Sequence, residues 1–392
     1  YKVVRHEDLH KANRNKKDEF YTTYDVIQAE LNYYTDKFKD KTVLCNCDNP
    51  FESNFCKFFL TNFNFLNLKR LICTSYSGSP VIGKQMSLFD ENDQPVNDQH
   101  GYVMDINHVP IANGRGITEQ DIDKLLHQKN VVKKLKGNGD FRSVECINYL
   151  KQADIVVTNE PFSLFREYIQ QLIDYNKKFL IIGNINAVKY KKTFPLFLNN
   201  QVWLGASIHS GDREFKVPDD YPLKAANSRV DETGNKYIRV KGVRWITNLK
   251  YKQRHEGIPL YKKYNPAEYP KYDNYDAIEV SKTADIPMDY PGVMGVPITF
   301  IDKYNPDQFE LLGMTSGRRE FSKKAWPTKR YINAIQHKSN GKEVNGININ
   351  TSAALRVDDP KGHTFYTADN LEGKVVMLYT RFLIRNKKVK KG

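Results

Sequence analysis

The sequence predicts an α/β fold in which a largely parallel sheet is flanked by helices. A β-branched run at residues 154–157 ends in Thr158-Asn159-Glu160-Pro161-Phe162 and is followed by a helical pattern and a second apolar run at 179–182. A similar strand at 42–45 follows another helical pattern. Apolar runs that alternate with helices are typical of parallel strands, which are buried on both faces.

The first elements follow from apolar spacing. Ile27, Leu31, Tyr34 and Phe38 share one face of an expected helix, and the strand at 42–45 comes directly after it. A short phenylalanine-rich helix and a strand at 71–73 should follow. Residues 77–138 show weak periodicity and many Gly, Asp and Asn residues, so we expect a loop-rich insertion there.

The remaining elements extend this pattern and change it after residue 202. A helix is expected at 144–150 and another at 164–173, between the runs at 154–157 and 179–182. Beyond 202 the pattern favours β-hairpins, including strands at 237–240 and 243–246 that close one edge of the sheet. The expected organisation is a catalytic body at 1–250 and a second region at 251–392.

Composition favours a nucleic-acid partner. Lys and Arg number 60 against 46 Asp and Glu, a net charge of +14 over 392 residues, and such a surplus attracts polyanions. A generally basic protein without such a partner is the alternative. Five cysteines, an odd number, predict reduced thiols, and Cys45-Asn46-Cys47 lacks a second ligand pair, so no metal is expected. No apolar run approaches the roughly 20 residues of a membrane span, and we expect a cytoplasmic protein without a membrane partner.

The loop Asn159-Glu160-Pro161-Phe162 is the candidate catalytic site. It follows a strand at the carboxyl edge of the expected sheet, where open α/β folds bind ligands. An asparagine side-chain oxygen and a main-chain carbonyl can accept both hydrogens of a planar amino group, while an aromatic ring stacks on the base. This chemistry suits methylation of an amino group. The alternative is an ordinary strand-to-helix connection, which Asn and Pro commonly make.

Residues 250–275 alternate cations with aromatic rings. The members are Tyr251, Lys252, Arg254, Tyr261, Lys262, Lys263, Tyr264, Tyr269, Lys271 and Tyr272. Such a mixture fits phosphate contacts combined with base stacking. Three prolines in the same stretch equally favour a poorly structured connector, and both interpretations remain open.

Several motifs, taken in order, resemble the EcoRI-type adenine-specific DNA methyltransferases over most of residues 16–205. They are Lys17-Asp18-Glu19-Phe20-Tyr21-Thr22, Cys45-Asn46-Cys47-Asp48-Asn49-Pro50 with Ser53-Asn54-Phe55, Gly139-Asp140-Phe141-Arg142-Ser143, Ala153 to Asn159 with Phe162 to Tyr168, Gly183-Asn184, Trp203-Leu204-Gly205 and Gly242 to Leu249. The resemblance implies a Rossmann-like S-adenosylmethionine-dependent methyltransferase sheet flanked by helices, with an inserted or C-terminal DNA target-recognition region.

The resemblance also implies a set of site residues. S-adenosylmethionine would be the methyl donor and S-adenosylhomocysteine the product, without a metal, and the substrate would be a flipped adenine in double-stranded DNA. The catalytic residues would be Asn159, Glu160, Pro161 and Phe162. The cofactor-binding residues would be Tyr21, Thr22, Cys47, Asp48, Asn49, Pro50, Asp140, Phe141 and Asn159. Candidate DNA contacts are Arg244, Trp245, Asn248, Arg254, Arg318 and Arg319. A companion restriction endonuclease is a further partner that the resemblance allows.

Glu160 departs from the family pattern, which has proline between the asparagine and the second proline. Proline fixes φ and holds the preceding chain in place, whereas glutamate releases that restraint and adds a carboxyl group near the base. We expect reduced or abolished turnover. Two other functions stay open: an inactive DNA-binding protein on a methyltransferase scaffold, and a methyltransferase that acts on RNA or on a protein glutamine.

Overall fold

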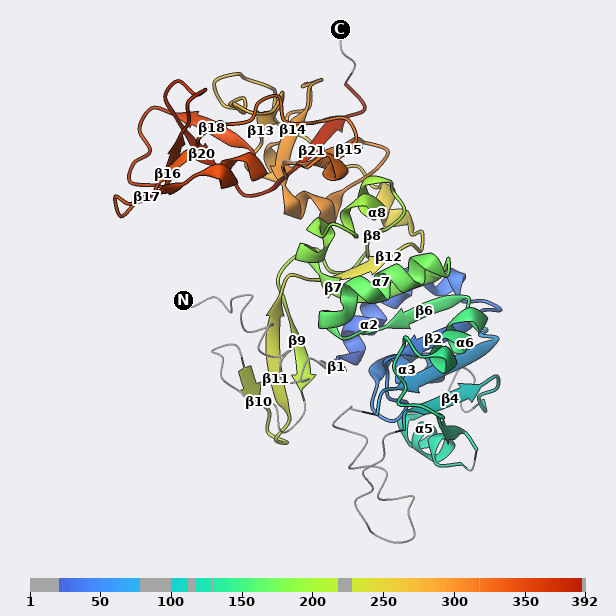
Figure 1. The fold of residues 1–392 in the computed structure, drawn as a ribbon. Coiled ribbons are helices and arrows are strands. Elements are labelled where there is room, and N and C mark those ends of the chain that lie inside the picture. Colours follow the sequence, from blue (N-terminus) through green and yellow to red (C-terminus); the bar gives the residue numbers. More distant parts are fainter. Residues whose placement is uncertain are drawn as a thin grey trace. The chain divides into compact units, whose positions relative to one another are not determined.

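The chain forms two compact units. The computed structural model describes residues 21–77, 100–111, 117–128, 130–217, 228–316 and 318–389. Unit 1 consists of residues 1–187 and 203–251, and unit 2 consists of residues 188–202 and 252–392 (Figure 1). None of the helices in these ranges combines the length and apolar character that crossing a membrane requires.

Unit 1 is built around an eight-stranded sheet (Figure 1). Four central strands, β3, β2, β6 and β7, are parallel, whereas β12 pairs antiparallel with both β7 and β8. The strands in spatial order are β5 (Val132–Lys134), β4 (Tyr102–Ile106), β3 (Arg70–Ser75), β2 (Thr42–Asn46), β6 (Ile155–Thr158), β7 (Lys178–Asn184), β12 (Val243–Thr247) and β8 (Trp203–Leu204). The predicted parallel α/β core is confirmed.

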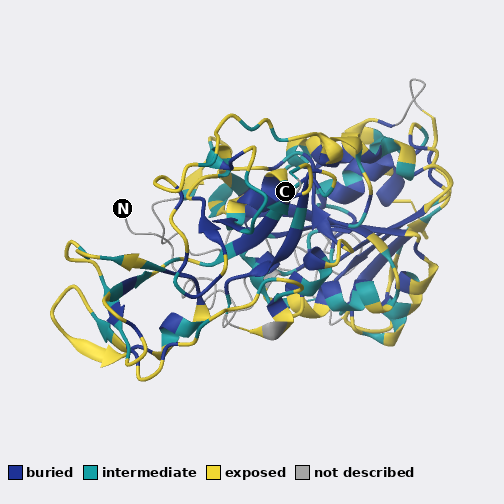
Figure 2. Ribbon diagram, turned by 90° about the horizontal axis from the view of Figure 1, so that it is seen from above, coloured by how far each residue is buried: buried dark blue, intermediate teal, exposed yellow. Residues whose placement is uncertain are grey.

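Helices cover both faces of this sheet. One face packs against α2 (Tyr24–Leu31), α3 (Asn54–Thr61) and α5 (Glu119–Leu126), and the other is covered by α6 (Val144–Gln152) and α7 (Phe165–Asp174) (Figure 1). Successive strand residues point to opposite faces of the sheet. Val43 and Cys45 therefore pack in the core beneath α2, α3 and α5, and Leu44 is buried on the opposite face. The strands are therefore buried on both sides, as Figure 2 shows.

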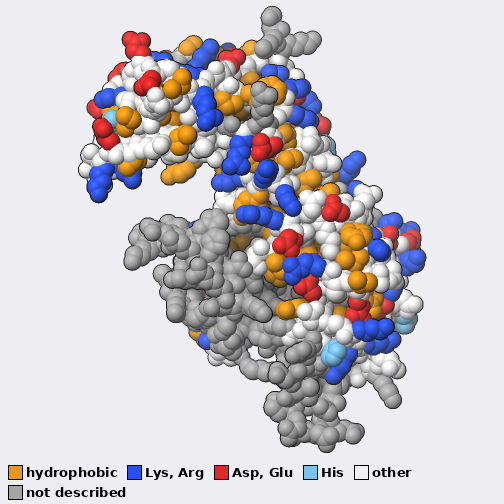
Figure 3. All heavy atoms as spheres, viewed as in Figure 1, with side chains coloured by type: hydrophobic (Ala, Val, Ile, Leu, Met, Phe, Trp, Pro, Cys, Tyr) orange, Lys and Arg blue, Asp and Glu red, His pale blue; other side chains and the backbone are white. Residues whose placement is uncertain are grey.

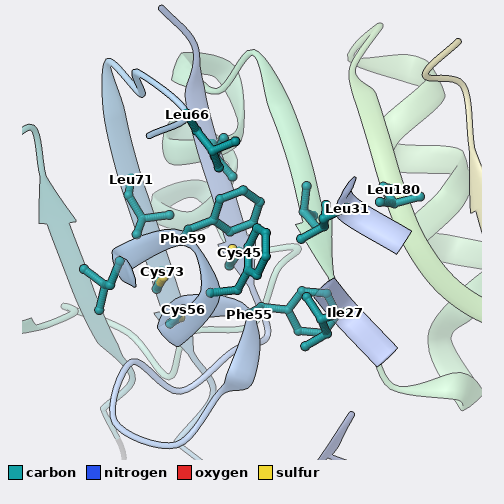
Figure 4. Packing of buried hydrophobic residues seen from close by; sticks show 14 of the residues in the cluster. Ile27, Leu31, Cys45, Phe55, Cys56, Phe59, Leu66, Leu71, Cys73 and Leu180 are labelled. Carbon is teal, nitrogen blue, oxygen red and sulfur yellow. The ribbon is translucent and has the colours of Figure 1, made fainter. Parts of the chain in front are cut away.

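The first predicted helix is present, with a break that the periodicity does not reveal. Its expected face is fully buried: Ile27 and Leu31 lie on α2, Tyr34 lies on the 3₁₀ helix Asn32–Lys37, and Phe38 follows it. Figure 4 shows Ile27 and Leu31 beside Phe55 and Phe59 of α3. Cys45, Cys56 and Cys73 belong to the same core, and none of the five cysteines, all of which are described, forms a disulfide.

Two expectations about unit 1 differ in part from the structure. Residues 77–138 contain regular structure in their described part: β4 pairs antiparallel with β3, β5 pairs antiparallel with β4, and α5 packs on α3. The strands at 237–240 and 243–246 form, but they do not pair. β11 (Lys236–Lys241) pairs with β9 (Asp212–Val217) and β10 (Ser228–Val230), and β12 enters the central sheet between β7 and β8. Gly242, at φ +73°, separates them.

Unit 2 is mainly β-structure. One four-stranded sheet has the order β13 (Ile278–Glu279), β14 (Met294–Pro297), β21 (Arg381–Asn386) and β15 (Phe309–Met314). A five-stranded sheet has the order β17 (Glu343–Asn345), β16 (Ile335–His337), β19 (Phe365–Thr367), β20 (Lys374–Met377) and β18 (Ala354–Val357). The helix α8 (Phe194–Leu198) belongs to this unit, and Phe194 stacks on Phe382 of β21.

Candidate active site

Two loops meet at the carboxyl edge of the central sheet. One follows β2 and begins at Cys47, and the other follows β6 and begins at Asn159. The two strands are adjacent and parallel, with Leu44 opposite Val156, so their loops emerge side by side. Cys47 has φ +70°, a left-handed conformation that costs energy for a residue other than glycine and is common at functional sites.

Asp48 is the central buried acid of the β2 loop. Its carboxylate accepts hydrogen bonds from the hydroxyl of Ser53 at 2.7 Å and from that of Thr158 at 2.5 Å. Burial raises the pKa of Asp48 well above its usual value, and these two hydroxyls together with the Asn159 main-chain N–H counteract part of that rise. Asp48 thus joins the two loops.

The same region is held by further contacts between strands and helices. The Thr158 hydroxyl also lies against the main-chain oxygen of Asn46, and the Tyr168 hydroxyl of α7 donates to the Asn46 side chain. Ser53 caps α3 by accepting from the N–H of Phe55 at 3.1 Å. Residues on β2, β6, α3 and α7 therefore fix the edge where the loops meet.

The candidate catalytic loop contains one unusual buried group. Asn159 is half-buried, and Pro161 accepts a hydrogen bond from the Leu164 N–H at 2.9 Å. Phe162 begins a 3₁₀ helix, Phe162–Leu164, and its side chain lies outside the described part of the structure. Glu160 is only 2% exposed, and neither carboxyl oxygen has a hydrogen-bond partner on another described residue.

Burial dominates the charge state of Glu160. Desolvation raises its pKa well above the usual value, and repulsion from Asp48 adds to that rise, while its own main-chain N–H opposes it. A buried carboxyl without neutralising partners is costly in the ionised form. Burial therefore favours the protonated, neutral form of Glu160 in the cofactor-free protein.

Asp140 and Phe141 lie near this edge but are engaged by other residues. Asp140 accepts from Nε and Nη2 of Arg142 at 2.9 and 2.7 Å, and this pairing lowers its pKa. Phe141 is 4% exposed and meets the ring of Tyr168 edge-on at 5.1 Å. A carboxylate can accept about four hydrogen bonds, so Asp140 retains capacity for a ligand, whereas Phe141 belongs to the core.

The N-terminal segment approaches the same place. β1 (Tyr21–Thr22) pairs with β9, and the Thr22 carbonyl accepts from the Asn54 side chain at 2.7 Å. Thr22 is buried, and its hydroxyl has no hydrogen-bond partner among the described residues. The side chain of Tyr21 and the motif residues 17–20 lie outside the described part. Asn49 and Pro50 are buried in the β2 loop, where Asn49 accepts from the Phe51 N–H at 3.0 Å.

Three candidate DNA contacts on and after β12 have structural roles. Trp245 is 1% exposed and packs edge-on against Phe55 in the core. Arg244 is buried and donates to the carbonyls of Val243 and His209, and Asn248 bonds main-chain atoms of Lys177 and Phe179. We correct Arg244 and Trp245, because β12 is buried on both faces and exposes neither side chain to a duplex. Asn248 follows the strand and is half-buried, so its contact with DNA stays a prediction.

The candidates in unit 2 differ from one another. Arg254 lies buried on the 3₁₀ helix Lys252–His255 and donates to the Asn200 side chain, so it is not exposed to a duplex. Arg318 is exposed, and the side chain of Arg319 lies outside the described part. Within residues 250–275, Tyr269, Tyr272 and Tyr275 are buried, while Lys252, Lys263 and Lys271 are exposed. The segment therefore combines core aromatics with surface cations.

Sequence reasoning gave no site role to Thr158, Ser53 or Tyr168. A serine before an apolar helical run is a capping signal, which could have placed Ser53 at the start of α3. Thr158 ends a strand directly before the candidate loop, so its position was visible, although its hydrogen bond to Asp48 was not. Tyr168 resembled an ordinary core residue of α7. The described residues contain no cluster of His, Cys, Asp or Glu with the arrangement of a metal site.

Comparison with known proteins identifies the family. The model of the family described as "Adenine-specific methyltransferase EcoRI" matches residues 8–387, nearly the whole chain. The chain belongs to this family. It is a DNA methyltransferase, its mixed sheet is consistent with the S-adenosylmethionine-dependent methyltransferase fold, and family membership implies S-adenosylmethionine as the methyl donor.

Relatives of this chain match it over most of its length. It is 48% identical over 311 residues to the Type II methyltransferase M.EcoRI of Escherichia coli, spanning 79% of this chain and 89% of the relative. It is 37% identical to the Type II methyltransferase M.MpnI of Mycoplasma pneumoniae, over 78% of this chain and 84% of the relative. No solved structure matches the chain significantly.

Proposed function

We propose that the protein transfers a methyl group from S-adenosylmethionine to the exocyclic N6 amino group of an adenine in double-stranded DNA. One observation supports this most: the loop at Asn159 and the loop at Asp48 meet at the carboxyl ends of adjacent parallel strands in a member of the adenine-specific methyltransferase family. The first loop suits an amino group and the second suits a cofactor.

The residues around the β2 loop fit the methyl donor. Thr22 and Glu160 present buried oxygen atoms that have no partner on another described residue, and Cys47 begins the loop in a left-handed conformation. Together with Asp48, Asn49, Pro50 and Asp140, these residues would hold S-adenosylmethionine. When bound, the cofactor supplies a methyl group activated by the positive charge on sulfur.

The candidate catalytic loop would prepare the amino nitrogen. The adenine amino group is a poor nucleophile because its lone pair is delocalised into the ring. The Asn159 side-chain oxygen and the Glu160 main-chain carbonyl would accept its two hydrogens, which favours a localised lone pair on nitrogen. The ring of Phe162 would stack on the adenine after it leaves the duplex. Orientation and fixed dipoles supply the acceleration.

Glu160 would slow this reaction without abolishing it. In place of proline it leaves φ less restrained at the carbonyl that must accept an amino hydrogen. Its buried carboxyl group also adds an electrostatic cost that proline lacks. We therefore propose an active methyltransferase with reduced turnover.

Most of the excess positive charge of the chain belongs to unit 2, which supports a DNA-binding role for this unit. Unit 2 has 27 Lys and Arg residues against 16 Asp and Glu, whereas unit 1 has 33 against 30. Figure 3 shows Lys and Arg side chains on the surface of both units. We propose that residues 252–392 form the target-recognition region, with Arg318 among its phosphate or base contacts.

The cellular setting follows from the substrate. Three relatives have names that begin with "Type II methyltransferase". We propose that this protein acts on DNA in the cytoplasm of a bacterium or of a phage-infected cell, beside a companion restriction endonuclease that cuts the same recognition sequence.

Transfer of labelled methyl from S-adenosylmethionine to unmethylated duplex DNA tests the proposal. The purified protein should label DNA slowly, with N6-methyladenine as the product, and Glu160→Pro should raise the rate. An RNA duplex and a protein acceptor serve as the competing substrates. Labelling of RNA or protein but not DNA would overturn the proposal, as would DNA binding without labelling by either form of the enzyme.

A further inference from the structure

Glu160 differs from the other buried carboxyl groups of unit 1. Among the described residues these are Glu30, Asp48 and Glu160. Glu30 accepts from the main-chain N–H groups of Ala206 and Ser207, each at 2.7 Å, and from the Tyr34 hydroxyl at 2.8 Å. Asp48 accepts from two hydroxyls. Glu160 has no such partner on another described residue, although it is as deeply buried.

The surroundings of Glu160 are acidic. Repulsion from Asp48 raises the pKa of Glu160. Burial raises the pKa of Tyr168, and Cys47, Glu160 and Asp48 raise it further. The side chain of Glu160 therefore lies among the residues at the carboxyl ends of β2 and β6, on the side of the cofactor loop. No Lys, Arg or His of the described residues forms an ion pair with it. A cationic ligand placed beside Glu160 would favour its ionised form and pair with it.

We propose that Glu160 binds a cationic group of the methyl donor, either its sulfonium or its α-ammonium group. This inference rests on the proposed function, because it requires S-adenosylmethionine in the pocket beside Asp48. The ligand supplies the positive charge that the protein itself does not place next to Glu160. Proline, the usual residue at this position, has no ionisable side chain. Glu160 therefore gives this chain a contact with the cofactor that the usual motif lacks.

Three ligands separate the two cationic groups. S-adenosylmethionine carries both, S-adenosylhomocysteine keeps only the ammonium, and 5′-methylthioadenosine carries neither. Calorimetric titration without DNA would give the affinity of the full-length protein and of Glu160→Gln for each. Gln keeps the size of the side chain and removes its charge. Glu119→Gln is the control, because Glu119 of α5 is 84% exposed and loses the same charge at the surface.

We expect Glu160→Gln to weaken S-adenosylmethionine binding by about tenfold or more, in keeping with a charged hydrogen bond. The affinity for 5′-methylthioadenosine and all affinities of Glu119→Gln should stay unchanged. A parallel loss for S-adenosylhomocysteine identifies the ammonium as the bound group, and an unchanged value identifies the sulfonium.

Two results would overturn the inference. One is equal affinity of Glu160→Gln and the parent protein for S-adenosylmethionine. The other is an equal loss for all three ligands, which indicates a damaged pocket. Failure of the proposed function is a separate result, because the labelling of DNA measures it, whereas these titrations measure only ligand binding by the cofactor pocket.

Discussion

The Thr158 hydroxyl donates to the Asp48 carboxylate at 2.5 Å and so joins the ends of two adjacent parallel strands. Thr158 ends β6 directly before the candidate catalytic loop, and Asp48 lies in the loop after β2. The same hydroxyl lies against the main-chain oxygen of Asn46. One side chain therefore couples the loop proposed to bind the methyl donor to the loop proposed to bind adenine.

Thr158→Val tests this coupling, because valine keeps the shape and removes the hydroxyl. Asp48 would lose one of its donors while remaining buried, so the free energy of unfolding should fall by about 1–3 kcal/mol. The affinity for S-adenosylmethionine should fall as well. Urea unfolding and calorimetry measure the two effects. Thr328→Val, at an exposed position in unit 2, is the control and should change neither.

The pKa shifts of Glu160 and Asp48 predict how stability depends on pH. Burial raises both pKa values, so the folded protein holds these protons more tightly than the unfolded chain does. Their contribution to stability is complete below the ordinary values of 4.5 and 3.8 and is lost as pH rises through the raised values. The cofactor-free protein should therefore lose stability from about pH 4.5 upward.

Glu160→Gln isolates one part of this loss. Cys56 raises the pKa of Asp48, and Cys47 and both carboxyl groups raise the pKa of Tyr168; these groups other than Glu160 remain in the variant. The variant should be more stable than the parent at pH 8 by about 1 kcal/mol or more, and the difference should vanish near pH 4. Unfolding at both pH values measures this. Parallel stability curves for the two proteins would contradict the prediction.

Gly205 predicts a steric effect at the end of β8. A Cβ there would lie 2.2 Å from Oε1 of Glu30 and 2.5 Å from Cβ of Trp245, closer than such atoms approach. Glu30 cannot move away easily because it binds the N–H groups of Ala206 and Ser207. Gly205→Ala should lower the free energy of unfolding by about 2–4 kcal/mol. Gly137→Ala, where a Cβ meets nothing within 4 Å, is the control and should have little effect.

The pattern of apolar and β-branched residues was sufficient to predict the parallel strands in the core of unit 1. The strands at 42–45, 71–73, 154–157 and 179–182 all form, because each is a β-branched or apolar run that the sheet buries on both faces. The site loops were visible for the same reason, since they follow those strands. Parallel strands have their carboxyl ends at the same edge of the sheet, so the loops that follow them must emerge at that edge.

Pairing between distant segments was not visible in the sequence. β11 and β12 are separated by Gly242 alone and have the pattern of a hairpin, yet they join different sheets. Trp245 and Arg244 then lie inside the sheet of unit 1, because β12 is covered on both sides. A polar or aromatic residue on a strand indicates a surface contact only when the partners of that strand are known.

Arg318 provides the sharpest test of DNA binding by unit 2. It is exposed in a unit that holds most of the excess positive charge, and the sequence pattern already marked it as a DNA contact. If Arg318 neutralises one phosphate, Arg318→Ala should weaken duplex binding and reduce the slope of log affinity against log salt by roughly one. Lys178→Ala is the control, because Lys178 is exposed at the amino end of β7, at the sheet edge opposite the site loops. Binding titrations at several salt concentrations measure both slopes. An equal reduction in the two variants would mean that the contribution of Arg318 is no more than general charge attraction, and an unchanged slope for Arg318→Ala would remove this residue from the DNA contact surface.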